Sequence, residues 1–153
     1  MVTWAEFTGA APEMAEDATR LFRRDGIDRA LLATVRGEEP PRINPIYVGI
    51  VDGRLYAFLL RSAKLTDIEH DGRFALHTHQ DPVAPSEFSV RGRARLVDTE
   101  AVRLAVAATW AFDVDETSRL VEFSIDSAAM GRRDGPEGGP PRSQSWRAGT
   151  ATT

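Results

Sequence analysis

The 153-residue sequence contains no cysteine and only one lysine, Lys64. The absence of thiols excludes disulfides, cysteine-ligated zinc or iron–sulfur centres and a cysteine nucleophile. No apolar run approaches the ~20 residues that a membrane-spanning helix needs. The first residues have neither the basic nor the apolar region of a signal peptide. These absences favour a cytoplasmic protein that does not associate with membranes.

The formal net charge of -4 argues against a nucleic-acid-binding protein held by bulk charge. The length predicts a single domain over 1–153, large enough to bury its own core. We expect an N-terminal strap over 1–11. Glycine and proline crowd 131–141, which predicts a mobile loop, and 149–153 is expected to form a flexible tail.

Hydrophobic periodicity predicts few helices and many strands. Helices are expected over 12–24, over 63–70 with Ser62 as N-cap, and from a cap at 98 or 99 to about 110. Strands are expected over 30–35, 42–51, 55–60, 74–79, 87–97, 120–125 and, as a last short one, 143–147. Asp52-Gly53 is a strong hairpin signal between two of these strands. The pattern predicts an α+β, mainly β protein with six or seven antiparallel strands in a closed or nearly closed barrel.

The predicted strand 55–60 is apolar on both faces, because Leu55, Ala57 and Leu59 alternate with other large apolar residues. An antiparallel sheet with one wet face would alternate apolar and polar residues. One face therefore lines the barrel interior, and a helix or a second subunit has to cover the other.

The segment Arg61-Ser62-Ala63-Lys64 joins an apolar strand to the start of a helix. Free backbone N–H groups, the positive end of the helix dipole, two cationic side chains and a hydroxyl meet there. This combination suits a phosphate. It is equally consistent with an ordinary helix N-cap flanked by two solvated cations.

Other polar patterns are less specific. Arg91, Arg93 and Arg95 project from one strand face, as a solvated barrel exterior or as a site for an anionic ligand. His77 and His79 share a strand face, but no third ligand has metal-site spacing, so we expect no metal. Hydrolase, phosphate-loop and dinucleotide-binding motifs are absent. A bound cofactor is therefore the best source of chemistry.

Several stretches, in order and spacing, resemble the pyridoxamine 5'-phosphate oxidase-like family of FMN-binding split barrels. The matching stretches are Leu-Ala-Thr-Val-Arg-Gly-Glu-Glu-Pro-Pro-Arg-Ile-Asn-Pro-Ile over 32–46, Asp-Gly-Arg-Leu-Tyr over 52–56 and Arg-Ser-Ala-Lys-Leu-Thr-Asp-Ile-Glu-His-Asp-Gly-Arg-Phe-Ala-Leu-His over 61–77. The opening Trp-Ala-Glu-Phe, the later Val-Arg-Gly-Arg-Ala-Arg-Leu and the terminal Trp146-Arg147 also fit small single-domain members. The resemblance implies a split-barrel homodimer with two cofactor sites at the subunit interface.

The resemblance also implies roles for individual positions. The strand beside the flavin ring corresponds to Arg42, Ile43, Asn44, Pro45 and Ile46, and the phosphate-holding segment to Arg61, Ser62 and Lys64. Glu87 stands where the oxidases place a glutamine that reaches the flavin from the other subunit, a departure from the family pattern. Trp146 is expected either to close over the ring or to anchor the tail in the core.

The resemblance implies an FMN-dependent oxidoreductase that acts on a small molecule, with no general acid or base that the sequence identifies. The chain lacks most substrate-contacting residues of the true oxidases, so vitamin B6 chemistry is not expected. Two alternatives stay open on the same fold. One is a reductase that uses the deazaflavin coenzyme F-420, and the other is a non-catalytic module that binds flavin or haem.

Overall fold

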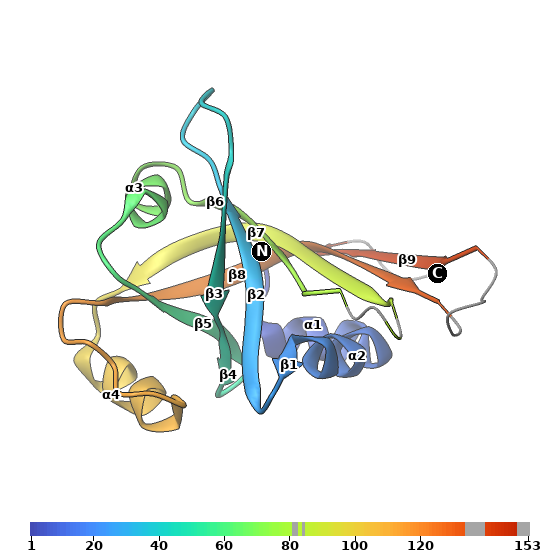
Figure 1. The fold of residues 1–153 in the computed structure, drawn as a ribbon, viewed down its shortest axis with the longest axis horizontal. Coiled ribbons are helices and arrows are strands. Elements are labelled where there is room, and N and C mark those ends of the chain that lie inside the picture. The colour runs from blue at the N-terminus through green and yellow to red at the C-terminus, as the bar shows by residue number, and fades with distance from the viewer. Residues whose placement is uncertain (81–82, 84, 134–139, 150–153) are drawn as a thin grey trace.

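The computed structural model describes residues 1–80, 83, 85–133 and 140–149. Over these residues the chain forms four helices and a curled antiparallel sheet of nine strands (Figure 1). The helices are α1 (Trp4–Ala10), α2 (Pro12–Phe22), α3 (Ala63–His70) and α4 (Glu100–Thr109). The strands are β1 (Arg23–Arg24), β2 (Ile27–Thr34), β3 (Arg42–Tyr47), β4 (Gly49–Val51), β5 (Arg54–Leu59), β6 (Arg73–His77), β7 (Glu87–Val97), β8 (Arg119–Arg132) and β9 (Arg142–Arg147).

The main path of the sheet runs β1-β2-β6-β7-β8-β5-β4, with β3 added to β2 and β9 added to β8. The 14-residue strand β8 pairs with β7 along most of its length. Its first half also pairs with β5 and its second half with β9. In Figure 1, β7, β8 and β9 extend together as an arm beyond the barrel, while α4 lies at the opposite end.

The predicted α+β barrel is confirmed, and the strand count exceeds six or seven for local reasons. The expected strand over 42–51 is interrupted at Val48, whose backbone N–H donates to the carbonyl of Asp28. The helix expected to reach Arg24 ends at Phe22, and the next two residues form β1. Strand β8 continues to Arg132, beyond the expected end at Ile125 and into the start of the predicted 131–141 loop. Residues 134–139 of that loop, 150–153 of the predicted tail, and 81, 82 and 84 of the loop before β7 lie outside the described residues.

The predicted N-terminal strap contains helix α1. Its first turn is fixed by a capping box in which Thr3 and Glu6 exchange backbone and side-chain hydrogen bonds. The Thr-x-x-Glu spacing was therefore a helix signal that the sequence interpretation overlooked. The helix buries Trp4 and Phe7 against Phe88 of β7, so the N-terminus contributes to the core.

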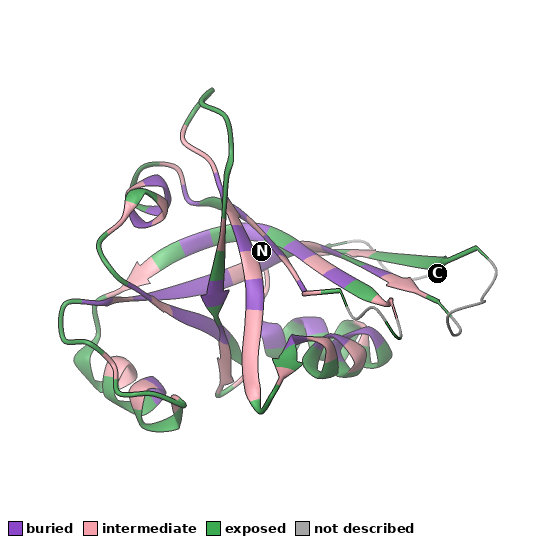
Figure 2. Ribbon diagram, in the orientation of Figure 1, coloured by how far each residue is buried: buried purple, intermediate pink, exposed green. Residues whose placement is uncertain are grey.

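The core lies inside the curled sheet, where buried residues alternate along β2, β6 and β7, and residues 120–123 in the first half of β8 are all buried (Figure 2). A cluster of aromatic rings occupies the end nearest α1 and α2, and its members pack edge to face or tilted at 5.0–6.2 Å: Trp4, Phe7, Phe22, Phe88 and Trp146. No helix of the described residues has both the length and the apolar character to span a membrane.

The pairing of β7 with β8 shifts register between Arg91 and Gly92. At this irregularity the two backbones approach so closely that a Cβ added to Gly92 would lie 1.9 Å from the carbonyl oxygen of Ser124. A backbone atom cannot move aside as a flexible side chain does. The bulge, and with it the bend that curls β7, therefore requires glycine at this position.

We predict that Gly92→Ala destabilises the fold by about 3 kcal/mol, because the methyl group has to push two central strands apart. Denaturant unfolding measures the loss. The matched control is Gly9→Ala in α1, where an added Cβ meets no atom within 4 Å. Equal unfolding free energies for the two variants would contradict the account of the bulge.

Candidate functional site

A pocket of about 350 Å³ opens between β2, β3, β5 and the start of α3, and we call it the β3–α3 pocket. Its volume falls in the range of small-molecule sites. The lining residues are Arg29, Pro45, Ile46, Tyr47, Phe58, Leu59, Leu60, Lys64 and His79. The pocket therefore combines an apolar wall with basic side chains, and no Asp or Glu among the described residues lines it.

The basic side chains come from two separate elements. Arg29 belongs to β2, and its buried Nε has no hydrogen-bond partner among the described residues. A buried charged donor that lacks a partner is costly, which indicates a missing acceptor. Lys64 lies in the first turn of α3, partly buried at the pocket wall. An anionic group in the pocket would supply the acceptor that Arg29 lacks.

His79 also lines the pocket. Burial lowers the pKa of His79 from its ordinary value, and the positive charges of Arg24 and Arg29 lower it further. The imidazole is therefore neutral at pH 7 and has a free nitrogen lone pair. The predicted histidine pair does not converge with a third metal ligand, because the described residues hold no cluster of three acidic or histidine side chains. His77 instead contacts the carbonyl of Thr78 and lies 3.5 Å from Glu87.

The residues predicted to hold a cofactor divide into three groups. Pro45, Ile46 and Lys64 line the β3–α3 pocket. Ile43 is 67% exposed on β3, and the side chain of Arg42 is directed to Asp67. Asn44 lies between Ile43 and Pro45 on β3 without lining the pocket.

The predicted phosphate segment is only partly as expected. Ser62 occupies the N-cap position of α3, but its hydroxyl donates to the carbonyl of Leu60 at 2.9 Å and makes no capping bond. The predicted N-cap position is therefore confirmed, although the Ser62 side chain does not form the cap. Arg61 is exposed and does not line the pocket, so within the chain Lys64 is the residue of this segment that reaches it.

Glu87 and Trp146 do not line the β3–α3 pocket of their own chain. Glu87 begins β7 and borders a smaller hollow over β8 and β9. The ring of Trp146 contacts Phe7 at 5.0 Å and packs against the core. Both belong to the arm formed by β7, β8 and β9 (Figure 1).

The arginine stripe on β7 is structural in part. Arg95 donates to the buried carboxylate of Glu122, which Arg54 also contacts at 2.8 Å. Arg93 donates to the carbonyl of Asp71. Arg91 is exposed, and its side chain forms no ion pair or hydrogen bond within the described part of the chain. The solvated, ion-paired interpretation thus accounts for Arg95 and Arg93.

One buried carboxylate, which sequence reasoning missed, fixes α3 beside the pocket. Asp67 is 1% exposed and accepts hydrogen bonds from Thr34 of β2, Arg36 of the following turn and Arg42 of β3. Burial alone would raise the pKa of Asp67. The hydrogen bonds from Thr34 and Arg36, with the charges of Arg42 and Arg36, outweigh burial and hold the pKa below its ordinary value. The ionised carboxylate therefore ties Lys64, one turn earlier on α3, to the sheet.

Comparisons with known proteins were made at the level of sequence and of fold. No protein-family model matches the sequence, and no curated protein matches it significantly. The fold is similar to that of a haem-binding protein from Mycobacterium smegmatis, with a TM-score of 0.57 and 17% identity over 78% of this chain and 52% of that one. This chain therefore spans about half the length of that protein.

Two further similar structures are general stress proteins. The general stress protein 26 of Bacillus anthracis has a TM-score of 0.57 and 21% identity, with 75% of this chain and 91% of that one covered. A Clostridium acetobutylicum protein related to general stress protein 26, of the pyridoxine phosphate oxidase family, has a TM-score of 0.61 and 10% identity, with 94% and 96% covered. The chain thus has the pyridoxamine 5'-phosphate oxidase-like split-barrel fold, and identities this low show the fold alone.

We predict that Asp67→Asn lowers the free energy of unfolding by about 2 kcal/mol, because the two arginines lose their charged partner while staying partly solvated. Glu69→Gln, an exposed carboxylate on the same helix, is the control and should change stability little. Denaturant unfolding at neutral pH measures both. A loss equal to that of the control would show that Asp67 does not hold α3.

The same substitution should change the acid limb of the stability curve. Because the pKa of Asp67 is lowered from 3.8, its contribution is complete above pH 3.8 and is lost as the pH falls through the folded-state pKa. The Asn variant, which has no such group, should lose less stability over that range.

Proposed function

We propose that the β3–α3 pocket binds FMN and that the chain is an FMN-dependent oxidoreductase acting on a small molecule. The supporting observation is the pairing of an unpartnered guanidinium N–H of Arg29 and the ammonium group of Lys64 with an apolar, aromatic wall. FMN has the complementary halves, since it carries a dianionic phosphate and a flat, largely apolar ring. The residues present therefore fit the group.

Each half of the cofactor has its own set of residues in this proposal. Lys64 and Arg29 neutralise the phosphate, and Arg61 adds a charge from the rim. The ring lies along β3, with Pro45 and Ile46 against it. When bound, the flavin supplies the hydride and electron transfer, and the protein supplies position, exclusion of water and the electrostatic field.

The proposed functional unit is a homodimer. On the outer face of the sheet, Leu31 is in register with Pro45 of β3, and Ala33 is in register with both Ile43 of β3 and Ala75 of β6. Residues in register project from the same face, so these side chains form one apolar patch, with Ile43 67% exposed. A second copy is the proposed cover for this patch.

Dimerisation also gives the arm a role. Glu87 and Trp146 lie apart from the pocket of their own chain. The resemblance places the residue that corresponds to Glu87 at the cofactor of the opposite subunit, and Trp146 lies on the same arm. We propose that the arm of each copy completes the pocket of the other. In this proposal the ring of Trp146 stays packed against Phe7 and does not contact the cofactor itself. Its role is to hold the arm in position.

Haem is a second candidate ligand because His79 presents a neutral imidazole to the same pocket. Arg29 and Lys64 would then hold carboxylates rather than a phosphate. A structural neighbour is itself a haem-binding protein. The deazaflavin coenzyme F-420 is a third candidate, since its ring and anionic tail need the same apolar wall and cations.

The absorption spectrum of the freshly purified protein separates these ligands. A two-band flavin spectrum is the expected result. A single deazaflavin band or a Soret band would replace FMN with the corresponding alternative. A colourless protein that also fails to bind added FMN would overturn the proposal.

We predict that Lys64→Ala weakens FMN binding about 10- to 100-fold, the effect of losing one charge-assisted hydrogen bond of about 1.5–3 kcal/mol. Arg93→Ala is the control, because Arg93 is an exposed arginine that contacts a backbone carbonyl away from the pocket. Flavin fluorescence quenching gives both dissociation constants. Equal constants for the two variants would contradict the phosphate assignment.

We predict a particle of about twice 16.8 kDa in solution. Ile43→Arg should shift the mass toward that of the monomer, because it places a charge in the proposed interface. Leu104→Arg is the matched control, since Leu104 is 61% exposed on α4, outside the apolar patch. Light scattering measures all three proteins, and a monomeric wild type would overturn the dimer.

A further inference from the structure

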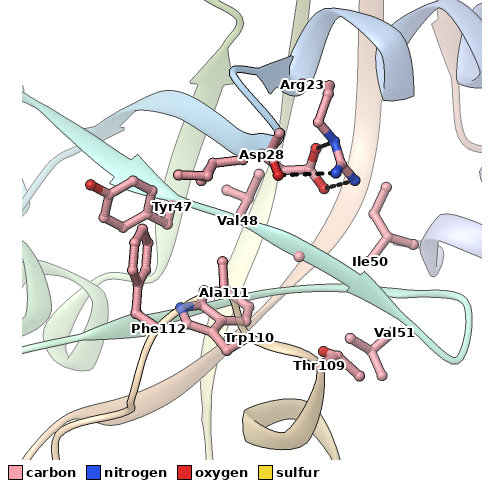
Figure 3. A pocket seen from close by; sticks show the side chains of 13 residues that line it. Arg23, Asp28, Tyr47, Val48, Ile50, Val51, Thr109, Trp110, Ala111 and Phe112 are labelled. Atoms are coloured by element: carbon pink, nitrogen blue, oxygen red, sulfur yellow. Dashed lines mark hydrogen bonds and ion pairs between the residues drawn. The ribbon is translucent and has the colours of Figure 1, made fainter.

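A second pocket, of about 190 Å³, lies beside the free edge of β4 and is called here the β4-edge pocket. Figure 3 shows it with Arg23 and Asp28 on one side of the β3–β4 segment and Trp110, Ala111 and Phe112 on the other. None of the residues predicted from the sequence to bind a cofactor lines it. It shares one residue, Tyr47, with the β3–α3 pocket.

The edge of β4 offers backbone hydrogen-bonding groups to this pocket. Strand β4 ends the main path of the sheet and pairs only with β5, through the Asp52-Gly53 turn. In a two-residue hairpin the residues that flank the turn exchange both hydrogen bonds, so the next residue, Ile50, directs its N–H and C=O away from β5. A donor and an acceptor therefore stand side by side at the pocket.

Aromatic side chains form the opposite wall. The ring of Phe112 packs against Tyr47 at 4.9 Å, and Trp110 contacts Phe58 edge to face at 5.0 Å. Trp110 can take this place because residue 49 is glycine. A Cβ at Gly49 would lie 2.6 Å from the indole ring. The shape of the pocket thus depends on the absence of a side chain at residue 49.

The charges at the pocket cancel. Asp28 forms an ion pair with Arg23 at 2.7 Å, and Arg23 also donates to the carbonyl of Gly26. Within the part of the chain that the structure describes, no other charged residue lines the pocket. A ligand here meets polar groups without a net charge, which favours a neutral molecule over an ion.

We propose that the β4-edge pocket binds a small, neutral, planar ring that carries a carboxamide or lactam edge. The adjacent carbonyl and N–H of such an edge complement the N–H and C=O of Ile50. The flat ring suits the wall of Trp110 and Phe112. This site is separate from the proposed FMN pocket, and its existence does not depend on that proposal.

The test is a titration of the FMN-free, ¹⁵N-labelled full chain with benzamide, followed by NMR. Saturable shifts are expected at the backbone N–H of Ile50 and the indole N–H of Trp110. N,N-dimethylbenzamide keeps the ring and carbonyl but has no N–H, so it should bind about 3- to 10-fold more weakly, as the loss of one neutral hydrogen bond implies. Absent shifts, shifts centred elsewhere or equal affinities for the two probes would overturn the proposal.

Two substitutions locate the site. Gly49→Ala should abolish benzamide binding, because its methyl group displaces Trp110, whereas Gly9→Ala should bind as the wild type does. Phe112 is a half-exposed loop residue, so Phe112→Ala removes part of the aromatic wall with little effect on the fold. This variant should weaken benzamide binding and tests the site if Gly49→Ala disturbs the fold. Unchanged binding in both Gly49→Ala and Phe112→Ala would contradict the assignment.

The same variants keep the two proposals apart. Gly49 and Phe112 do not line the β3–α3 pocket, but Trp110 and Phe112 pack against Phe58 and Tyr47, which do. Both variants should therefore weaken FMN binding much less than they weaken benzamide binding. A chain that binds benzamide at Ile50 but no FMN supports this site and overturns the proposed function. A chain that binds FMN but not benzamide supports the proposed function and overturns the β4-edge site.

Discussion

The geometry of the candidate site depends on one buried carboxylate. Asp67 accepts hydrogen bonds from Thr34 of β2, Arg36 of the turn and Arg42 of β3. These bonds fix the helix that carries Lys64. A buried carboxylate is costly to leave without donors, so each of these hydrogen bonds helps to hold α3 in place. The distance between Lys64 and the apolar wall of β3 is therefore set by a residue that lies outside the pocket.

Much of the architecture could be predicted because it is encoded locally. The limits of α3 and β7 follow from a strand–helix junction and from strict alternation, and both agree with the structure. The break at Val48 and the extension of β8 to Arg132 could not be predicted in the same way. Each depends on a backbone partner distant in sequence, Asp28 for the first and β7 for the second, where Glu87 pairs with Gly131.

The candidate site, too, could be predicted only in part from the sequence. Lys64, Pro45 and Ile46 were identified from the sequence and line one pocket. Arg29 and His79 were not predicted to join them, because nothing in a single sequence shows that the start of β2 and the segment after β6 face β3 and α3. Arg42 was predicted to lie along a cofactor, yet it contacts Asp67, a pairing over 25 residues that no local pattern reveals.

The shared strand β8 also determines when the molecule can become complete during synthesis. Val2 exchanges both backbone hydrogen bonds with Ile125, and Trp4 and Phe7 from the first helix pack against Phe88. The residues of α1 are thus synthesised long before some of the residues that cover their apolar surface. Folding of this chain is accordingly a late event, in which the N-terminus closes over a barrel whose central strand comes from the last quarter of the sequence.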